Sequence, residues 1–193
     1  LELSIFRDNK EYEIIFNDGN TTKKLKQIGK TKKRGSKITF LPSKNIFSSI
    51  EFNSSIIEKR IRELAFLNKG ISITLLDKKS KKEKEFVHKY DGGITEFVKH
   101  INKKKPILVN KNENLVFKKP IYVTAIKNNV TVECSLEWNA GYGEEVLPFT
   151  NNIPQKEGGT HLLGFRSALT RVINRYSNDR NSKKNKLSIS GED

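Results

Sequence analysis

Cysteine, methionine and long apolar runs are what this sequence has least of. Its 193 residues include one cysteine, Cys134, and no methionine. A single cysteine excludes an internal disulfide framework and favours a reducing, cytoplasmic location. No apolar run approaches the roughly 20 residues of a membrane-spanning helix, so we expect no membrane partner. Leu1 to Ser4 show neither an initiator methionine nor the features of a signal peptide, and we expect a piece of a longer chain.

Motifs that would carry chemistry are missing as well. Neither the phosphate loop G-x-x-x-x-G-K-[ST] nor a G-x-G-x-x-G fingerprint is present. Cys134 is expected in mid-strand as a small buried hydrophobe, and Glu144 and Glu145 follow a glycine-rich turn, which is typical of solvated loop acids. The histidines lack the spacing and the neighbours of zinc ligands: His88, His100, His161. We therefore expect no catalytic and no metal-binding residue in this chain.

Acidic residues are too few to balance the basic ones. The chain has 37 Lys and Arg against 22 Asp and Glu, a formal charge of +15. Such an excess favours binding to the phosphates of nucleic acid. It is mostly lysine beside abundant Asn and Ile, however, as translation of an A/T-rich genome would also give. The charge is uneven, because residues 21–37 hold eight Lys or Arg and no acid.

Strand signals fill the beginning of the chain. Residues 1–7 alternate apolar and polar side chains, and Asp8 to Lys10 form a turn signal before the next alternating stretch. A second turn signal at 17–20 precedes two more short strands at 25–28 and 37–41. The first forty residues therefore predict an antiparallel meander.

Helix and strand signals alternate in the middle of the chain. Asn53 or Ser54 can cap a helix that Gly70 ends, with Arg60, Arg62 and Glu63 on its wetter side. Strands are predicted at 71–75 and 86–90, and a short helix at 94–101, before a basic, loop-rich stretch at 102–119. A hairpin about Asn128-Asn129 joins strands at 121–125 and 130–138, and 146–149 is a further candidate strand.

The strongest helix signal starts at Thr160. Gly164 and Ala168 lie four residues apart, and we expect a groove of small residues there that admits close backbone packing. Gly158 and Gly159 precede this helix, a geometry that can receive an anion but is also common turn chemistry. Disorder is expected at 178–186, which is polar and basic. One face of the helix is apolar: Leu162, Phe165, Leu169, Val172, Tyr176.

Two segments resemble the ATP-driven subunit family of bacterial DNA gyrase. The first, residues 60–70, reads RIRELAFLNKG and is followed by a strand and by YDGGI at 90–94. The second, residues 149–171, contains FTNNIP, EGGTH, GFR and ALTR in that order. Residues 35–42 and 136–139 match in addition. The order and approximate spacing of these matches extend over nearly the whole chain, so the resemblance is specific.

The resemblance implies an α+β fold in two parts. Residues 1–45 would be the last strands of a GHKL-type ATPase sandwich. Residues 46–193 would be most of a transducer domain of the ribosomal-protein-like type, with a left-handed β-α-β crossover. This segment would relay nucleotide state to the DNA gate in ATP-driven strand passage and negative supercoiling.

The same resemblance implies ligands and partners for the intact subunit. It would hydrolyse ATP with Mg²⁺, dimerise on ATP binding, act on double-stranded DNA and assemble with the gyrase A subunit. The catalytic, magnesium-binding and lid residues of the family have no counterpart here. We therefore expect the fragment alone to be inactive and to bind no cofactor tightly.

Two residues can be matched to family sites. Ser36 stands where the family usually has threonine beside the adenine pocket, so a water-mediated nucleotide contact is implied; the alternative is a strand serine that faces solvent. Arg166 matches an arginine that lines the cavity between two subunit arms, where it would meet DNA phosphate. The alternative for Arg166 is a salt bridge at the rim of the helix.

Two other classes of protein compete with this interpretation. A non-enzymatic, basic nucleic-acid-binding module would explain the charge and a ribosomal-protein-like fold. A dimerisation or chaperone-type module of the wider GHKL group is the other alternative. The EGGTH segment at 157–161 argues against the latter.

Overall fold

The computed structural model describes residues 1–79, 81–180 and 189–190 and has a mixed α and β fold. Contacts divide the chain into two units, Leu1–Ile57 and Glu58–Asp193. None of the helices over the described residues combines the length and the apolar character that a membrane crossing requires.

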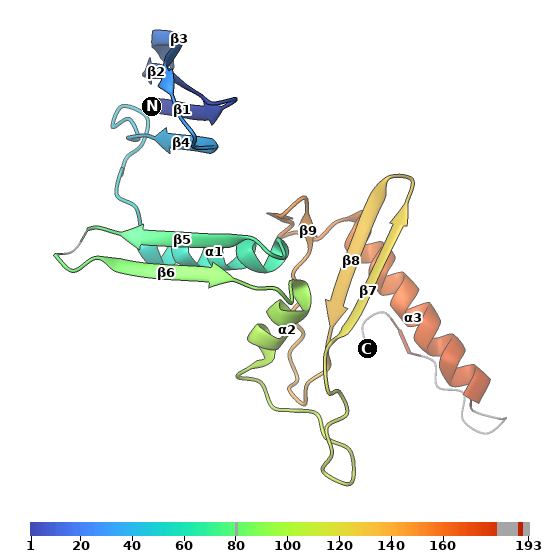
Figure 1. Cartoon of the computed structure of the whole chain (residues 1–193). Coiled ribbons are helices and arrows are strands. Elements are labelled where there is room, and N and C mark those ends of the chain that lie inside the picture. Colours follow the sequence, from blue (N-terminus) through green and yellow to red (C-terminus); the bar gives the residue numbers. More distant parts are fainter. Residues whose placement is uncertain (80, 181–188, 191–193) are drawn as a thin grey trace. The chain divides into compact units, whose positions relative to one another are not determined.

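The first unit is built on a four-stranded antiparallel sheet (Figure 1). Its strands are β1 (Glu2–Arg7), β2 (Lys10–Asn17), β3 (Asn20–Lys30) and β4 (Gly35–Thr39), in the order β3-β2-β1-β4. Positive φ angles at Asp8 (53°) and Asn9 (58°) form the predicted tight turn between β1 and β2. The strands follow the predicted turn signals closely, because a short polar turn specifies a hairpin locally.

The fourth strand lies elsewhere than predicted. The meander holds for β1 to β3, but β4 pairs with β1 and not with β3, so that part of the prediction is wrong. Pairing with β1 places Ile38 opposite Leu3 on a common face. β3 offers a poorer edge, since its side chains are exposed and rich in lysine, and its pairing with β2 is interrupted by bulges.

The second unit opens with a helix and a hairpin. Helix α1 (Ser54–Leu67) spans the division between the units and is capped by Asn53, whose Oδ1 accepts from the backbone N of Ser55 (3.0 Å) and Ile56 (3.2 Å). Gly70, with φ of 84°, follows its end. The hairpin of β5 (Ser72–Asp77) and β6 (Lys84–Lys89) comes next, as predicted.

An aromatic cluster forms the centre of this unit. Phe66 of α1 is 1% exposed, and its ring stacks on Tyr90 at a centroid distance of 3.6 Å and on Phe97 at 4.8 Å. Phe97 belongs to α2 (Ile94–Asn102). The cluster therefore fastens α1, the end of β6 and α2 to one another through buried apolar area.

The remaining strands are short hairpins. β7 (Ile121–Lys127) and β8 (Val130–Leu136) are joined at Asn128 and Asn129, which have φ of 51° and 61°, so the predicted hairpin is confirmed. The candidate strand at 146–149 is wrong for 146–148. Only Phe149–Thr150 forms a strand, β9, paired with β10 (Ile153–Pro154). Pro148 has no N–H to give to a ladder, which limits β9 at that end.

Helix α3 (Thr160–Arg180) differs in part from its prediction. Val172 and Tyr176 are 62% and 57% exposed, so the expected apolar face does not continue along the helix. Asn174 on another face binds the backbone of Ile189, accepting from its N and donating to its O at 2.9 Å each. The prediction of a groove of small residues is also wrong, because a Cβ at Gly164 would meet no atom within 4 Å.

The predicted disorder at 178–186 is wrong for 178–180, which are helical. Residues 181–186 lie outside the described residues.

Candidate functional site

The register of the first sheet places Ser36 on its apolar face. Ser36 lies opposite Ile5, and Ile5 lies opposite Tyr12 on its other side. Residues directly paired across a sheet point to the same face. Ser36 is therefore in one row with Ile5 and Tyr12, on the face that also carries Leu3, while the neighbouring Lys37 points to the opposite face.

A polar connection joins α1 to the turn between β9 and β10. Arg60 donates through Nη2 to the backbone carbonyl oxygen of Asn152 at 2.8 Å. The side-chain amide of Asn152 donates to Oδ1 of Asn68 at 2.9 Å, and the amide of Asn68 donates to the carbonyl oxygen of Leu64 at 2.7 Å. We call Arg60, Asn68 and Asn152 the α1–turn clamp. It is the link that holds β9 and β10 beside the end of α1 (Figure 1).

The clamp acts on a turn of special backbone geometry. Asn151 and Asn152 have φ of 48° and 67°. Asparagine tolerates this left-handed conformation better than most side chains, so the pair makes a tight turn that presents a carbonyl oxygen outward. Only a few residues then lead to α3. Gln155 N donates to Pro148 O and Gly158 N to Gln155 O, both at 2.9 Å, which keeps this connection folded.

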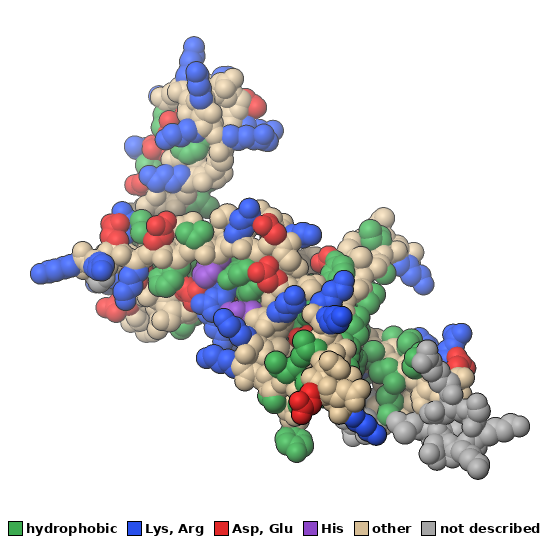
Figure 2. Space-filling model, turned by 60° about the horizontal axis from the view of Figure 1, so that its bottom comes forward, with side chains coloured by type: hydrophobic (Ala, Val, Ile, Leu, Met, Phe, Trp, Pro, Cys, Tyr) green, Lys and Arg blue, Asp and Glu red, His purple; other side chains and the backbone are tan. Residues whose placement is uncertain are grey.

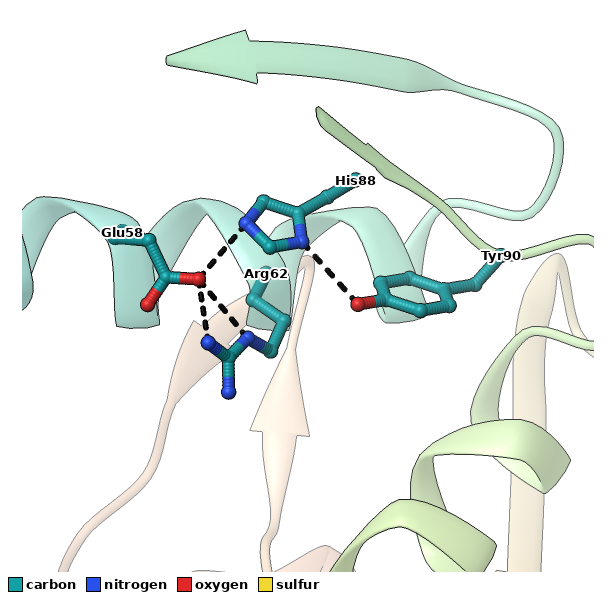
Figure 3. A network of polar contacts seen from close by, with 4 residues as sticks. All are labelled: Glu58, Arg62, His88 and Tyr90. Carbon is teal, nitrogen blue, oxygen red and sulfur yellow. Dashed lines mark hydrogen bonds and ion pairs between the residues drawn. The ribbon is translucent and has the colours of Figure 1, made fainter. Parts of the chain in front are cut away.

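A second network joins α1 to β6 (Figure 3). Oε1 of Glu58 accepts from Arg62 Nε at 3.1 Å and Nη2 at 2.5 Å. His88 is 8% exposed, and its Nε2 lies 2.9 Å from the same oxygen without the geometry of a hydrogen bond. His88 Nδ1 lies 3.2 Å from the Tyr90 hydroxyl. Burial raises the pKa of Tyr90, opposed by nearby Arg62, so its hydroxyl stays protonated and can donate to Nδ1.

Arg60, Arg62 and Glu63, which were predicted on the wetter side of α1, are 37%, 36% and 21% exposed, against 0% for Ala65 and 1% for Phe66. All three also make polar contacts within the unit, which the prediction did not include. Arg60 Nη1 lies 3.0 Å from Glu63 as an ion pair. Polar groups brought by β6 and by the β9–β10 turn meet this side of the helix. A pattern of apolar spacing does not contain that information, although Glu58 and Arg62 at i, i+4 are a recognisable pair.

Arg166 lies on α3 and pairs with a loop carboxylate. Its Nη2 is 2.7 Å from Oε2 of Glu144. The next residue, Glu145, accepts from Lys105 Nζ at 2.7 Å. The two glutamates are 63% and 44% exposed, as expected for solvated loop acids. The salt bridge considered as an alternative role for Arg166 is therefore present, and it leaves the DNA contact untested.

The remaining candidates from the sequence are the possible metal ligands and the glycines before α3. Within the described part of the chain, no group of three His, Cys, Asp or Glu is placed to hold a metal ion. The His100 ring lies 5.4 Å from that of Phe66, as a packing residue would. Gly158 has φ of 77°, and a Cβ there would lie 3.3 Å from Leu162, so the turn itself requires glycine.

On the face shown in Figure 2, the basic side chains of the described residues do not gather into one site. In Figure 2 the lysines and arginines are spread over the visible face with acidic side chains between them. Ion pairs such as Lys23 with Glu13 (3.6 Å) and Lys78 with Glu83 (3.2 Å) neutralise part of the charge. On this face of the described residues, charge alone therefore marks no nucleic-acid site.

Solved structures define the class of fold. The chain is similar to the 43K ATPase domain of Thermus thermophilus gyrase B, crystallised with an aminocoumarin, at 31% identity and a TM-score of 0.78 over 95% of this chain and 49% of that one. It shares a fold with the B-subunit of the DNA gyrase from Myxococcus xanthus, with a TM-score of 0.73, 19% identity and coverage of 92% and 50%. The fold is that of a part of gyrase B ATPase-domain structures.

Sequence comparison gives the family. Residues 93–193 match the family model described as DNA gyrase B. The DNA gyrase B protein of Rickettsia felis is 43% identical over 100% of this chain, and that of Chlamydia muridarum is 40% identical over 98%. The chain belongs to the DNA gyrase B family. It spans 23% of the length of both relatives.

Proposed function

We propose that this chain is the segment of a DNA gyrase B protein that relays nucleotide state from the ATPase site towards the DNA gate. Residues 1–45 are then the last strands of the GHKL ATPase sandwich. Residues 46–193 are most of the transducer domain, of the ribosomal-protein-like type with a left-handed β-α-β crossover. The family membership supports this assignment over a stand-alone nucleic-acid-binding module.

The observation that carries the relay is the α1–turn clamp. Helix α1 begins in the first unit and continues into the second, and Arg60 and Asn68 hold the turn at Asn152. The short folded connection after this turn enters α3. A displacement of α1 is thereby transmitted to the start of α3 through hydrogen bonds and backbone, as in relays made of rigid elements joined by packed contacts.

The intact subunit supplies the chemistry. It binds and hydrolyses ATP with Mg²⁺, dimerises when ATP is bound, and passes double-stranded DNA together with the gyrase A subunit in the cytoplasm. The chain by itself has no complete ATPase site and is inactive. Ser36 contributes a hydroxyl at the nucleotide site; the residue is exposed in this chain and so is accessible to a ligand.

Arg166 is proposed to contact DNA phosphate in the cavity between two subunit arms. A half-exposed guanidinium near the start of a long helix supports this role, since arginine binds phosphate through two parallel N–H donors. In the intact subunit, Arg166→Ala should weaken DNA-stimulated ATP hydrolysis more than basal hydrolysis. Equal loss of both would show that Arg166 has a structural role only.

Restoring the flanking sequence tests the assignment as a whole. The chain alone should hydrolyse no ATP, whereas the full-length subunit mixed with gyrase A should supercoil relaxed plasmid when ATP is added. ATP turnover by the isolated chain, or a full-length subunit that never supercoils with gyrase A, would overturn the proposal. Tight, salt-dependent binding to RNA with indifference to duplex DNA would favour the nucleic-acid-binding alternative.

A further inference from the structure

Two adjacent glutamates in one loop hold two different cations. Glu144 reaches Arg166 on α3, and Glu145 reaches Lys105 after α2, each with an oxygen 2.7 Å from the nitrogen. The side-chain exposures are 63% for Glu144 and 36% for Arg166. Glu144 and Glu145 thus each neutralise a different cation.

The loop that carries Glu144 is anchored independently of Arg166. Ala140 N donates to the carbonyl oxygen of Pro106 at 3.0 Å, and the side-chain amide of Asn139 donates to Oδ1 of Asn102 at 3.4 Å. The Lys105–Glu145 pair adds a third attachment. Glu144 is therefore brought to Arg166 by a loop that is already held in place, and the carboxylate loses little freedom when the pair forms.

The ion pair between Arg166 and Glu144 is weak enough for another anion to displace the carboxylate. An exposed ion pair contributes about 0–1 kcal/mol, because water screens both charges. A phosphate oxygen competes for the same guanidinium and can accept two N–H donors of arginine at once. While Glu144 lies on Nη2, its negative charge offsets that of the guanidinium and it occupies one N–H donor. A phosphate that binds on this side of Arg166 has to replace the carboxylate.

We propose that Glu144 is an intramolecular competitor that masks Arg166 until DNA phosphate displaces it. The inference rests on the proposed DNA contact of Arg166 and deepens it. Glu144 is a positioning residue: it touches no DNA and acts through the arginine. Its effect is to lower the affinity of the empty subunit for duplex DNA and to make engagement of Arg166 depend on a correctly placed phosphate.

Neutralising Glu144 without changing its size isolates this effect. In the full-length subunit with gyrase A, Glu144→Gln should lower the concentration of linear duplex DNA that half-stimulates ATP hydrolysis by about two- to fivefold. Glu144→Lys should lower it further. Glu145→Gln is the matched comparison: it makes the same chemical change one residue away, releases Lys105 instead of Arg166, and should lower the DNA concentration less than Glu144→Gln does.

The double variant separates the inference from the function on which it rests. In an Arg166→Ala background, Glu144→Gln should have no effect on the DNA concentration required. If Arg166→Ala raises that concentration but Glu144→Gln does not lower it, or if Glu145→Gln lowers it equally, the masking role is wrong and the DNA contact stands. If Arg166→Ala leaves the DNA dependence unaltered, the DNA contact itself is wrong and the masking role falls with it.

Discussion

Arg60 of α1 donates a hydrogen bond to the backbone carbonyl oxygen of Asn152 at 2.8 Å, across 92 positions of the sequence. The acceptor is a main-chain atom, so the contact depends on the conformation of the turn and not on the side chain at 152. A hydrogen bond from a charged donor contributes about 1.5–3 kcal/mol, and partial exposure of Arg60 places this one towards the lower end. The contact thus links a helix position to a specific backbone geometry.

That geometry predicts an order of stabilities at position 152. Asn152→Gly keeps the left-handed backbone and loses the hydrogen bond to Asn68, at a cost of about 0.5–1.5 kcal/mol. Asn152→Ala loses the same bond and adds the strain of a positive φ, about 1 kcal/mol more. Denaturant unfolding measures both. Asn151→Gly is the control and should change little; an alanine tolerated as well as glycine at 152 would contradict the strained turn.

Two neighbouring residues of β6, the buried His88 and the exposed Val87, should contribute unequally to the free energy of unfolding. His88→Ala removes the contacts with Glu58 and Tyr90 and leaves a cavity, which should lower the free energy of unfolding by about 2–3 kcal/mol. Val87 points to the other face of the same strand and is 60% exposed. Val87→Ala should therefore stay within about 0.5 kcal/mol of the parent. Similar losses in thermal or denaturant unfolding would show that the network contributes no specific stability.

Cys134 provides a test by pH. Burial raises the pKa of this thiol above its ordinary value of 9.0, so the folded chain should be alkylated by iodoacetamide more slowly at pH 8 than the denatured chain. A folded pKa above the unfolded one contributes stability that is present below pH 9.0 and is lost as pH rises through the folded value.

The comparison with Cys134→Ala isolates that contribution from those of the tyrosines. The difference in unfolding free energy between the parent and the variant should fall as the pH is raised from about 8 to about 10. A difference that stays constant, together with equal alkylation rates in the folded and denatured chains, would show that the fold does not shield the thiol.

Local chemistry accounts for what was predictable from the sequence. The cap at Asn53 and the hairpin at Asn128-Asn129 depend on neighbouring residues alone, and both form as expected. The partner of β4 and the surroundings of Arg60 depend on residues far away in the chain. Apolar periodicity cannot rank two sheet edges that both accept a strand, nor can it show that Asn152 meets α1.

Ser36 and Arg166, the two residues matched to family sites, show the same limit of prediction from sequence. The predicted strand at 37–41 began just after Ser36, whereas β4 includes it, and the face to which Ser36 points required the register with Ile5. It named a salt bridge as one role for Arg166 without identifying Glu144, because a partner 22 positions away in a loop follows from the fold. Their roles towards nucleotide and DNA remain predictions.

Ser36 predicts a loss of nucleotide affinity. In the full-length subunit, Ser36→Ala should weaken ATP binding by about two- to tenfold, the range of one neutral hydrogen bond, whereas Ser36→Thr keeps the hydroxyl and should stay near the parent. Lys37→Ala, on the opposite face of β4, is the control. Equilibrium binding of a non-hydrolysable ATP analogue measures all three. An alanine variant that binds as well as the parent would remove Ser36 from the nucleotide site.

The most direct test of the relay compares two activities of one variant. In the full-length subunit with gyrase A, Arg60→Ala should leave basal ATP hydrolysis within about twofold while supercoiling per ATP hydrolysed falls at least about fivefold, as loss of coupling between sites predicts. Lys59→Ala, the exposed neighbour on α1, should change neither. If hydrolysis and supercoiling fall in equal proportion, or if supercoiling by Arg60→Ala is unchanged, α1 does not transmit nucleotide state through Asn152.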